Sequence, residues 1–244
     1  MNNTPPIKIQ DLGQIDYDQA LTQQRELNQA LIDGPGQPTI LLVEHPPVIT
    51  LTRRAKPNLL ADEQQLEKLG VTTAETDRGG DITYHGPGQL VVYPILKLGD
   101  FGLNLSSYMR LLERAVIDTI ATWGIAGHNE CGATGVWVNP NRVAGDAQRP
   151  VANDVPTNTA KICAMGVRIR KNTTLHGLAL NVAPDMSHFD LIVPCGLEGR
   201  PVISMQQILG DACPSIDLVK KTLSDRLVEQ LGSTEHGIQC ALGT

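Results

Sequence analysis

Apolar residues recur three or four positions apart in several stretches of the chain, a spacing that places them on one face of a helix. By this pattern, amphipathic helices are predicted over residues 16–32, 61–69, 105–123 and 215–231. Their ends carry the expected signals, because Gly70 and Gly124 follow two of them and Ser215 begins the last. The chain therefore has enough amphipathic helix to cover a sheet.

Short runs rich in apolar and β-branched residues lie between these helices and are typical of strands. Strands are predicted over residues 39–43, 48–51, 71–76, 90–96, 135–138, 160–170 and 173–182. The last two flank Lys171 and Asn172, which is the pattern of a hairpin. Helices and strands alternate without a strict βαβ order, so we expect an α+β fold with a mixed, largely antiparallel sheet flanked by helices.

Residues 139–159 differ in composition: they are rich in Asn, Pro, Asp, Thr and Ala and show no hydrophobic periodicity. An inserted loop is expected there. The length of 244 residues by itself fits one large domain or two small ones. Because the inserted loop accounts for part of that length, we expect one domain.

Composition excludes several classes of protein. Lys and Arg number 20 against 26 Asp and Glu, for a net charge of −6, and a mildly acidic chain is a poor general binder of nucleic acid. No apolar run approaches the roughly 20 residues that cross a bilayer, and the first residues do not resemble a signal peptide. A cytoplasmic location is the resulting expectation.

Five cysteines are present, an odd number without a CxxC pair, so a disulfide framework is not expected. Cys195 follows an apolar run and lies between Pro194 and Gly196, where a thiol is either an exposed nucleophile or a buried, inert side chain. Cys163 lies within an apolar strand and is expected to pack in the core. His128 and Cys131 have no second pair at ligand spacing, so a metal site is not expected.

Residues 78–89 hold four glycines, interleaved with polar side chains. Neither a phosphate-binding P-loop nor a GxGxxG pattern is present. Glycines permit close approach of the backbone to a ligand, so this segment is either a pocket wall or a glycine-rich turn between strands.

Two further residues carry potential chemistry. Lys161 begins an apolar strand and is either a half-buried group suited to proton transfer or a solvated strand end. His176 lies in a second apolar strand, where a structural histidine is the ordinary interpretation.

Taken together, these segments resemble the lipoyl(octanoyl) transferase family, the octanoyltransferases of lipoate biosynthesis. The resemblance covers about residues 15–230 and is carried by residues 44–51, 78–89, 161–170, 176–182 and 194–196, in matching order and spacing. It implies the catalytic fold that lipoate and biotin protein ligases share.

The resemblance also implies a reaction in which an octanoyl group moves from acyl carrier protein to the ε-amino group of a lysine on a lipoyl domain, with Cys195 as the acyl-thioester nucleophile and Lys161 as its partner. The acceptors would be lipoyl domains of 2-oxoacid dehydrogenase E2 subunits and the glycine cleavage H protein, and no cofactor or metal is expected. The implied substrate-binding residues are Arg78, Gly79, Gly80, Asp81, Ile82, Thr83, Tyr84, His85, Ala164, Met165, Gly166, Gly177, Leu178 and Ala179. Pocket support is expected from Gly86, Gly88, Gln89, His176 and Asn181.

Acidic protein partners would require a local basic surface on this acidic chain. Arg53, Arg54 and Lys56 form one basic segment, and Lys161, Arg168, Arg170 and Lys171 form another. Scattered, solvated charges are the alternative. Two other functions stay open from the residues: an ATP-using lipoate or biotin ligase, which needs no cysteine, and a non-catalytic carrier-binding protein.

Overall fold

The computed structural model describes residues 4–143, 159–193 and 200–233. Its main sheet has the strand order β1-β2-β6-β10-β9-β8-β7, in which only β1 and β2 pair in parallel. These strands are β1 (Lys8–Gln14), β2 (Thr39–Glu44), β6 (Gln89–Ile95), β7 (Ile125–Glu130), β8 (Ala133–Val143), β9 (Ala160–Arg170) and β10 (Thr173–Asn181). A smaller sheet has the order β4-β3-β5, from β3 (Val48–Leu51), β4 (Thr72–Glu75) and β5 (Ile82–His85).

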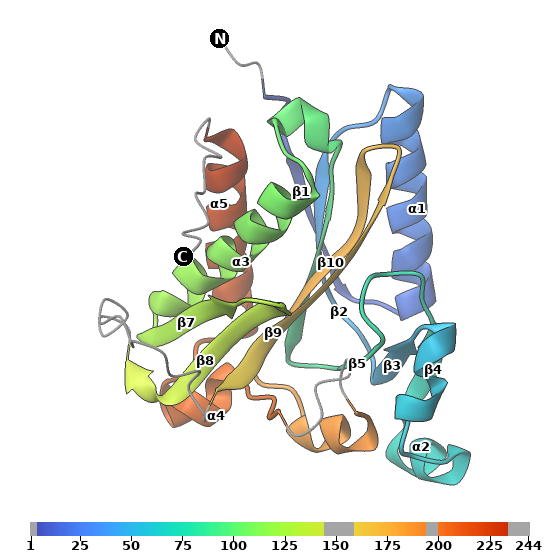
Figure 1. The fold of residues 1–244 in the computed structure, drawn as a ribbon, viewed down its shortest axis with the longest axis vertical. Helices are drawn as coiled ribbons and strands as arrows, with labels where there is room; N and C mark the ends of the chain where they lie inside the picture. Colours follow the sequence, from blue (N-terminus) through green and yellow to red (C-terminus); the bar gives the residue numbers. More distant parts are fainter. Residues whose placement is uncertain (1–3, 144–158, 194–199, 234–244) are drawn as a thin grey trace.

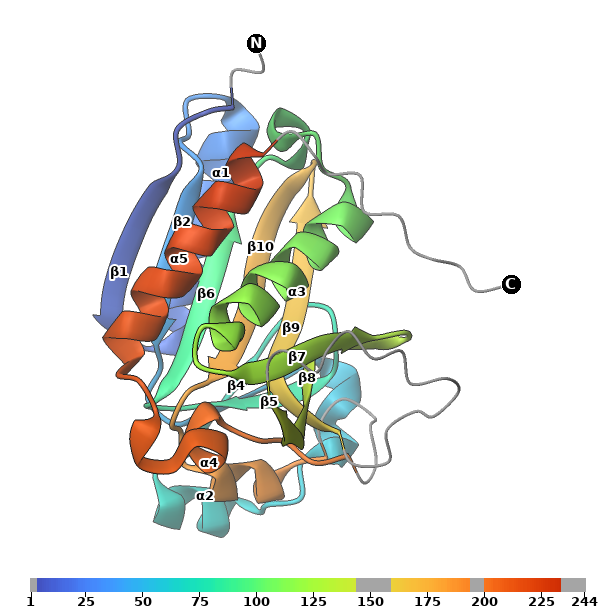
Figure 2. The same cartoon turned by 90° about the vertical axis from the view of Figure 1, so that its left-hand side faces the viewer.

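Helices cover both faces of the main sheet, as Figures 1 and 2 show. Helices α3 (Leu105–Ala121) and α5 (Ile216–Gly232) pack side by side on one face, and α1 (Tyr17–Asp33) lies on the other. The short helices α2 (Glu63–Leu69) and α4 (Met205–Leu209) lie at the lower end in these views. The predicted α+β class, with a largely antiparallel sheet flanked by helices, is confirmed.

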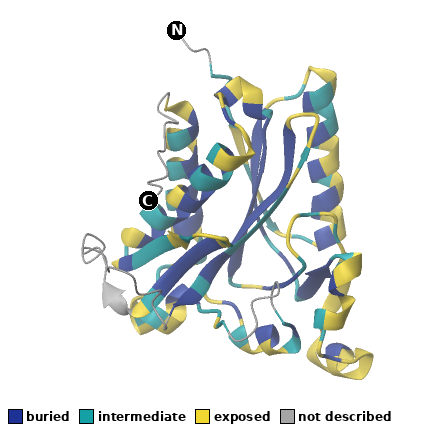
Figure 3. Cartoon of the chain, in the orientation of Figure 1, coloured by how far each residue is buried: buried dark blue, intermediate teal, exposed yellow. Residues whose placement is uncertain are grey.

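The core has separate parts because the main sheet is covered on both sides. The largest cluster joins β2, β6, β8, β9 and β10 to α3 and α5, and a second joins the opposite face of β2, β6 and β10 to α1. The small sheet has its own cluster around Ile49, Ile82 and Tyr84. The central strands are accordingly buried along their length, as Figure 3 shows.

The predicted helices agree with α1, α2, α3 and α5 to within two residues at most ends, while β1, β5, β7 and α4 have no counterpart among the predicted elements. Strand β8 also continues to Val143, so its backbone extends five residues into the segment expected to be a loop. The reason is pairing with β7, in which Val143 faces Ile125. Residues 144–158 lie outside the described part of the chain.

Strand β10 leaves regular geometry at His176, where φ is +60°. The pairing of β10 with β6 ends at Leu178–Val92, and the next bridge is Thr173–Lys97, so His176 lies in an unpaired stretch whose counterpart on the other strand contains Pro94, which has no N–H to donate. The His176 N–H instead donates to the Gln24 side chain on α1, at 2.9 Å. This irregularity changes the direction of the His176 side chain within a strand that is otherwise regular.

No helix in the described ranges is long and apolar enough to cross a membrane.

Gly88 provides a test of the packing between β6 and β10. Its φ is +84°, and a Cβ there would lie 2.4 Å from the Ala183 carbonyl oxygen, whereas Gly102 has a φ of +67° and no neighbouring atom within 4 Å. We expect Gly102→Ala to lower the free energy of unfolding by about 1–2 kcal/mol, for the left-handed backbone alone. Gly88→Ala should cost about 3 kcal/mol or more, because the backbone collision is added. Urea unfolding of both variants measures the difference, and equal losses would contradict the collision.

Candidate active site

A pocket of about 480 Å³, its open mouth included, lies on the face of the main sheet that α1 covers. Elements that are distant in the sequence meet here: α1, the glycine-rich segment, β6, β9 and β10. The lining residues are Tyr17, Arg78, Thr83, His85, Val91, Tyr93, Lys161, Ala164, Met165, Gly166, His176, Gly177, Leu178 and Ala179.

The pocket exists because two cross-strand pairs on this face have almost no side chain. Gly166 pairs with Gly177, and Ala164 pairs with Ala179, across β9 and β10. A Cβ on Gly166 would lie 2.5 Å from the Gly79 carbonyl oxygen, and a Cβ on Gly177 would lie 2.1 Å from the Val92 carbonyl oxygen, so both positions require glycine for close backbone packing. The expected substrate segments 164–166 and 177–179 therefore lie next to one another, although their centres are more than ten residues apart in sequence.

Strand β5 divides the glycine-rich segment between two environments. Thr83 and His85 line the pocket, while Ile82 and Tyr84 point into the core of the small sheet. The Tyr84 hydroxyl lies 2.8 Å from Nδ1 of His188 in that core, and burial raises the pKa of Tyr84 to about 12. Tyr84, which was expected to contact substrate, thus lies on the opposite side of its strand from the pocket.

Arg78 and Gly79 cross over β9 at close range. The Gly79 N–H donates to the Val167 carbonyl oxygen at 3.0 Å, and a Cβ on Gly166 would lie 2.5 Å from the Gly79 carbonyl oxygen. Arg78 lines the pocket and donates from Nη2 to the Thr50 hydroxyl at 3.1 Å. Gly79 and Gly80 do not line this pocket but an adjoining groove, and Asp81 lines neither.

Buried histidines form the polar wall of the pocket in their neutral form. Burial, together with the neighbouring His45, lowers the pKa of His85 to about 3. Its Nδ1 lies 2.7 Å from Gln89 Oε1, so Nδ1 carries the proton and Nε2 is left as an acceptor. Burial also lowers the pKa of His45, whose Nδ1 donates to the Ile15 carbonyl oxygen and whose Nε2 accepts from the Tyr93 hydroxyl at 2.8 Å.

Gln89 and Asn181 connect the His85 wall to the strand that carries Lys161. The Gln89 amide donates to Asn181 Oδ1 at 2.9 Å, and the Asn181 amide donates to the Ile203 carbonyl oxygen at 3.1 Å. The Ile203 N–H donates in turn to the carbonyl oxygen of Lys161 at 3.0 Å. Gln89 and Asn181 are buried but do not line the pocket. Gly86, which is buried, and Gly88, which is partly buried, do not line it either.

The irregular backbone at His176 aims its ring at Asp77. His176 Nε2 lies 2.8 Å from Asp77 Oδ1, and Asp77 also pairs with Arg168 and, at 3.7 Å, with Arg25. Burial opposes ionisation of Asp77, but the His176 hydrogen bond and the cations outweigh it, so the pKa of the carboxyl is lowered. Burial also lowers the pKa of His176, against the opposing effect of Asp77.

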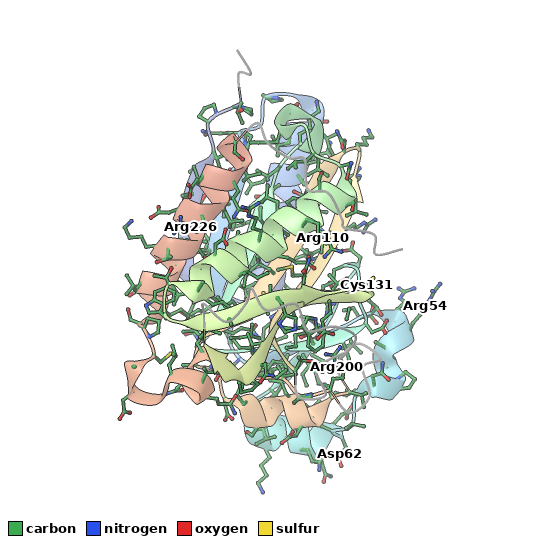
Figure 4. All side chains as sticks on the ribbon, turned by 60° about the vertical axis from the view of Figure 1, so that its left-hand side comes forward. Arg54, Asp62, Arg110, Cys131, Arg200 and Arg226 are labelled. Atoms are coloured by element: carbon green, nitrogen blue, oxygen red, sulfur yellow. The ribbon has the colours of Figure 1, made fainter. Side chains whose placement is uncertain are left out.

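Lys161 lines the pocket from the beginning of β9. Its Nζ lies 4.7 Å from the ring centroid of the buried Trp137, and Arg200 Cζ lies 3.6 Å from the same centroid. Arg200 is held by a two-pronged ion pair with Glu130, at 2.6 and 2.8 Å, and by the Thr159 hydroxyl at 2.6 Å. Figure 4 shows Arg200 among the side chains below the β7–β8 hairpin, whose turn carries Cys131.

The predicted nucleophile, Cys195, lies outside the described residues. Val193 and Arg200 border that segment, and the chain that follows Arg200 runs beside Lys161, since the Lys161 N–H donates to the Pro201 carbonyl oxygen at 2.9 Å. Of the cysteines that the structure describes, Cys163 is fully buried, and burial raises its pKa well above the ordinary range. No cluster of three or more His, Cys, Asp or Glu side chains suited to a metal ion occurs in the described ranges.

Sequence reasoning did not identify several residues that line or hold the pocket. Tyr17 falls within the helix predicted over residues 16–32, and Val91 and Tyr93 fall within the strand predicted over residues 90–96, but none of them was expected to border a pocket. Alternation along residues 90–96 could have placed Val91 and Tyr93 on one face, but no local signal showed which face borders a cavity. Asp77 contacts His176, and Trp137 contacts Lys161, so only their spatial neighbours identify them.

Comparison with known proteins finds relatives in both sequence and fold. An octanoyltransferase from Chloroflexus aggregans is 43% identical over 227 residues, which cover 92% of this chain and 93% of that protein. The bi-partite lipoate protein ligase from Thermoplasma acidophilum superposes with a TM-score of 0.63 at 16% identity, over 92% of this chain and 83% of the other. A biotin protein ligase from Aquifex aeolicus superposes with a TM-score of 0.53 at 13% identity, over 92% and 70%.

The two structural neighbours show that the fold is shared with lipoate and biotin protein ligases. The sequence also matches the family described as the lipoyl protein ligase A/B catalytic domain over residues 16–228. Together with the octanoyltransferase at 43% identity, this match identifies an acyltransferase: the chain belongs to the lipoyl protein ligase A/B catalytic domain family and, within it, to the octanoyltransferases.

Proposed function

We propose that the protein transfers an octanoyl group from octanoyl-acyl carrier protein to the ε-amino group of a lysine on lipoyl domains, through a thioester on Cys195. The observation that supports this most directly is a pocket whose accessible surface is mostly apolar, with glycine and alanine on its sheet side and Lys161 on its wall. The acceptors would be the lipoyl domains of 2-oxoacid dehydrogenase E2 subunits and the glycine cleavage H protein.

The octanoyl chain would occupy the space beside Ala164, Gly166, Gly177 and Ala179. An alkyl chain is favoured there because each buried methylene contributes about 0.8 kcal/mol. The neutral His85 and the hydroxyl of Tyr93 bind to protein partners rather than to water, so the chain need not displace their hydrogen bonds. A charged histidine would require solvation in the same space.

In the first half of the reaction, the Cys195 thiolate attacks the donor thioester carbonyl and forms a new C–S bond. The bond to the carrier thiol then breaks, and that sulfur takes the proton that Cys195 lost. One thioester replaces another, so the step is nearly balanced in free energy and needs no ATP. A nearby ammonium group favours the thiolate, which is the role proposed for Lys161.

In the second half, the acceptor lysine attacks the Cys195 thioester as a neutral amine. It must lose a proton as the amide forms, and Lys161 in its neutral form accepts that proton. The path of the chain supports this pairing, because residues 201–203 hydrogen-bond to the backbone of Lys161 a few positions after Cys195.

A basic docking surface is supported at only one of the two basic segments. Arg53, Arg54 and Lys56 are exposed on a short 3₁₀ helix, residues 53–58, and Figure 4 shows Arg54 projecting outward. Arg53 pairs with Glu75 at 3.6 Å, but both side chains of this pair are exposed. This turn begins just after Thr50, the hydrogen-bond partner of Arg78 in the pocket. The second segment does not form one basic face, since Lys161 lines the pocket and Arg168 pairs with Asp77.

Incubation with octanoyl-acyl carrier protein, without ATP, tests the proposal. Intact-mass measurement should show the gain of one octanoyl group on the wild-type protein, and its loss after addition of apo lipoyl domain. The Cys195→Ser variant should show no adduct, while Cys163→Ser serves as the matched control and should still become acylated. A strict requirement for ATP, or an unchanged adduct in Cys195→Ser, would contradict the mechanism.

Lys161 is tested by substitution at the same site. Lys161→Ala should slow transfer at least about a hundredfold, the usual contribution of a positioned acid–base group. Lys161→Arg should also be slow, because a guanidinium keeps the charge but cannot act as a base at neutral pH. Lys68→Ala, at an exposed position of α2, is the control. Near-normal transfer by Lys161→Ala, with a normal circular dichroism spectrum, would assign this lysine no part in the reaction.

The buried histidines predict a pH dependence of stability. Between pH 6.5 and about 3 the unfolded chain binds a proton at residue 85 that the folded chain does not bind. Stability should therefore fall as pH falls through this window, by up to about 1.4 kcal/mol per pH unit from this residue. In His85→Gln the slope of the unfolding free energy against pH should decrease by about 1.4 kcal/mol per pH unit, which corresponds to the uptake of one proton fewer on unfolding. Urea titrations at several pH values measure it, and an unchanged slope would contradict a neutral His85.

A further inference from the structure

A groove of about 790 Å³, its open side included, adjoins the pocket. One wall is the first turns of α3, with Leu105 and Met109, and another is the β7–β8 turn, with Gly132 and Ala133. Gly79 and Gly80 of the glycine-rich segment also line it. We refer to this space as the Leu105 groove.

The Leu105 groove and the pocket share Lys161, Met165 and Gly166 in their linings. The two spaces therefore adjoin the same short stretch of β9, where Gly79 crosses over Gly166. If the acyl chain lies in the pocket with its carbonyl near Lys161, the remainder of the donor must leave this junction in another direction. The Leu105 groove begins at that junction.

The chemistry of the groove indicates what it binds. Lys161 is the one ionisable side chain of its described lining, and several lining residues are Gly or Ala, which leave backbone N–H and C=O groups accessible. Leu105 is 51% exposed, which is high for a large apolar side chain in the first turn of an otherwise well-packed helix. Exposed backbone groups and an apolar edge suit a thin, neutral chain of amides and methylenes better than a charged or aromatic ligand.

We propose that the Leu105 groove binds the pantetheine arm of the acyl donor, a neutral chain of two amides and methylene groups that ends in the thiol. This inference rests on the proposed function. When the enzyme nucleophile forms its C–S bond with the octanoyl carbon, the C–S bond to pantetheine breaks. The released thiol takes the proton lost by the nucleophile and withdraws along the groove, while the octanoyl group stays in the pocket.

The test compares two octanoyl donors in the first half-reaction, without acceptor. Octanoyl-pantetheine carries the arm, whereas S-octanoyl-mercaptoethanol carries the same acyl group and almost no arm. Thiol release is followed under single-turnover conditions for wild type, Leu105→Glu and Leu218→Glu. Leu218 is the matched control, since it lies in the first turn of α5, is 47% exposed and is distant in the sequence from the groove. A glutamate in the first turn is compatible with either helix.

In Leu105→Glu, the ratio of the second-order acylation rate constant for the long donor over that for the short donor should fall at least about tenfold, because the apolar edge is lost and a charge is introduced. In Leu218→Glu the ratio should stay within about twofold of wild type. An unchanged ratio in Leu105→Glu would overturn the proposal. A normal first half-reaction in Leu105→Glu combined with slow transfer to apo lipoyl domain would also overturn it, because that result would assign the groove to the acceptor. Failure of wild type to release thiol from either donor would instead contradict the proposed function.

Discussion

The site depends on one constraint: two facing pairs of residues on β9 and β10 consist only of glycine and alanine. A sheet covered on both faces is normally filled by large apolar residues, as it is where α3 and α5 pack. On the opposite face, the pairs Gly166–Gly177 and Ala164–Ala179 leave a hollow that α1 does not fill. The glycine-rich segment and strand β5 of the small sheet lie over this hollow, and their side chains Arg78, Thr83 and His85 complete the wall of the pocket.

Hydrogen bonding keeps that pocket open and uncharged. Three polar side chains of its wall have protein partners: His85 binds Gln89, Tyr93 binds His45, and Arg78 binds Thr50. Satisfied groups do not need water, so the wall can face an apolar chain without a large desolvation cost. The same network extends through Asn181 and Ile203 to the backbone of Lys161, so the neutral wall and the ionisable lysine belong to one rigid arrangement.

Glu130 brings together two residues, Thr159 and Arg200, that are 41 positions apart in the sequence. Thr159 follows residues 144–158 and Arg200 follows residues 194–199, and both contact Glu130. Arg200 also lies against Trp137, on which Lys161 packs. The carboxylate at the end of β7 thereby joins the residue before β9 and the chain before α4 beside the lysine. The guanidinium hydrogen bond from Arg200 holds the pKa of Glu130 low.

Much of the fold could be predicted from the sequence, because helix periodicity, capping residues and strand composition are local: α1, α3, α5 and the β9–β10 hairpin follow from them. The motif segments, read as a resemblance, also indicated an octanoyltransferase. The sequence could not show that Tyr84 and His85 face opposite sides of β5, since four residues inside a glycine-rich segment carry no visible period. Nor could it place His176, whose side chain direction depends on Pro94 in the neighbouring strand and on Gln24 in α1. Such positions were decided only by tertiary structure, because they depend on contacts between residues 80 to 150 positions apart.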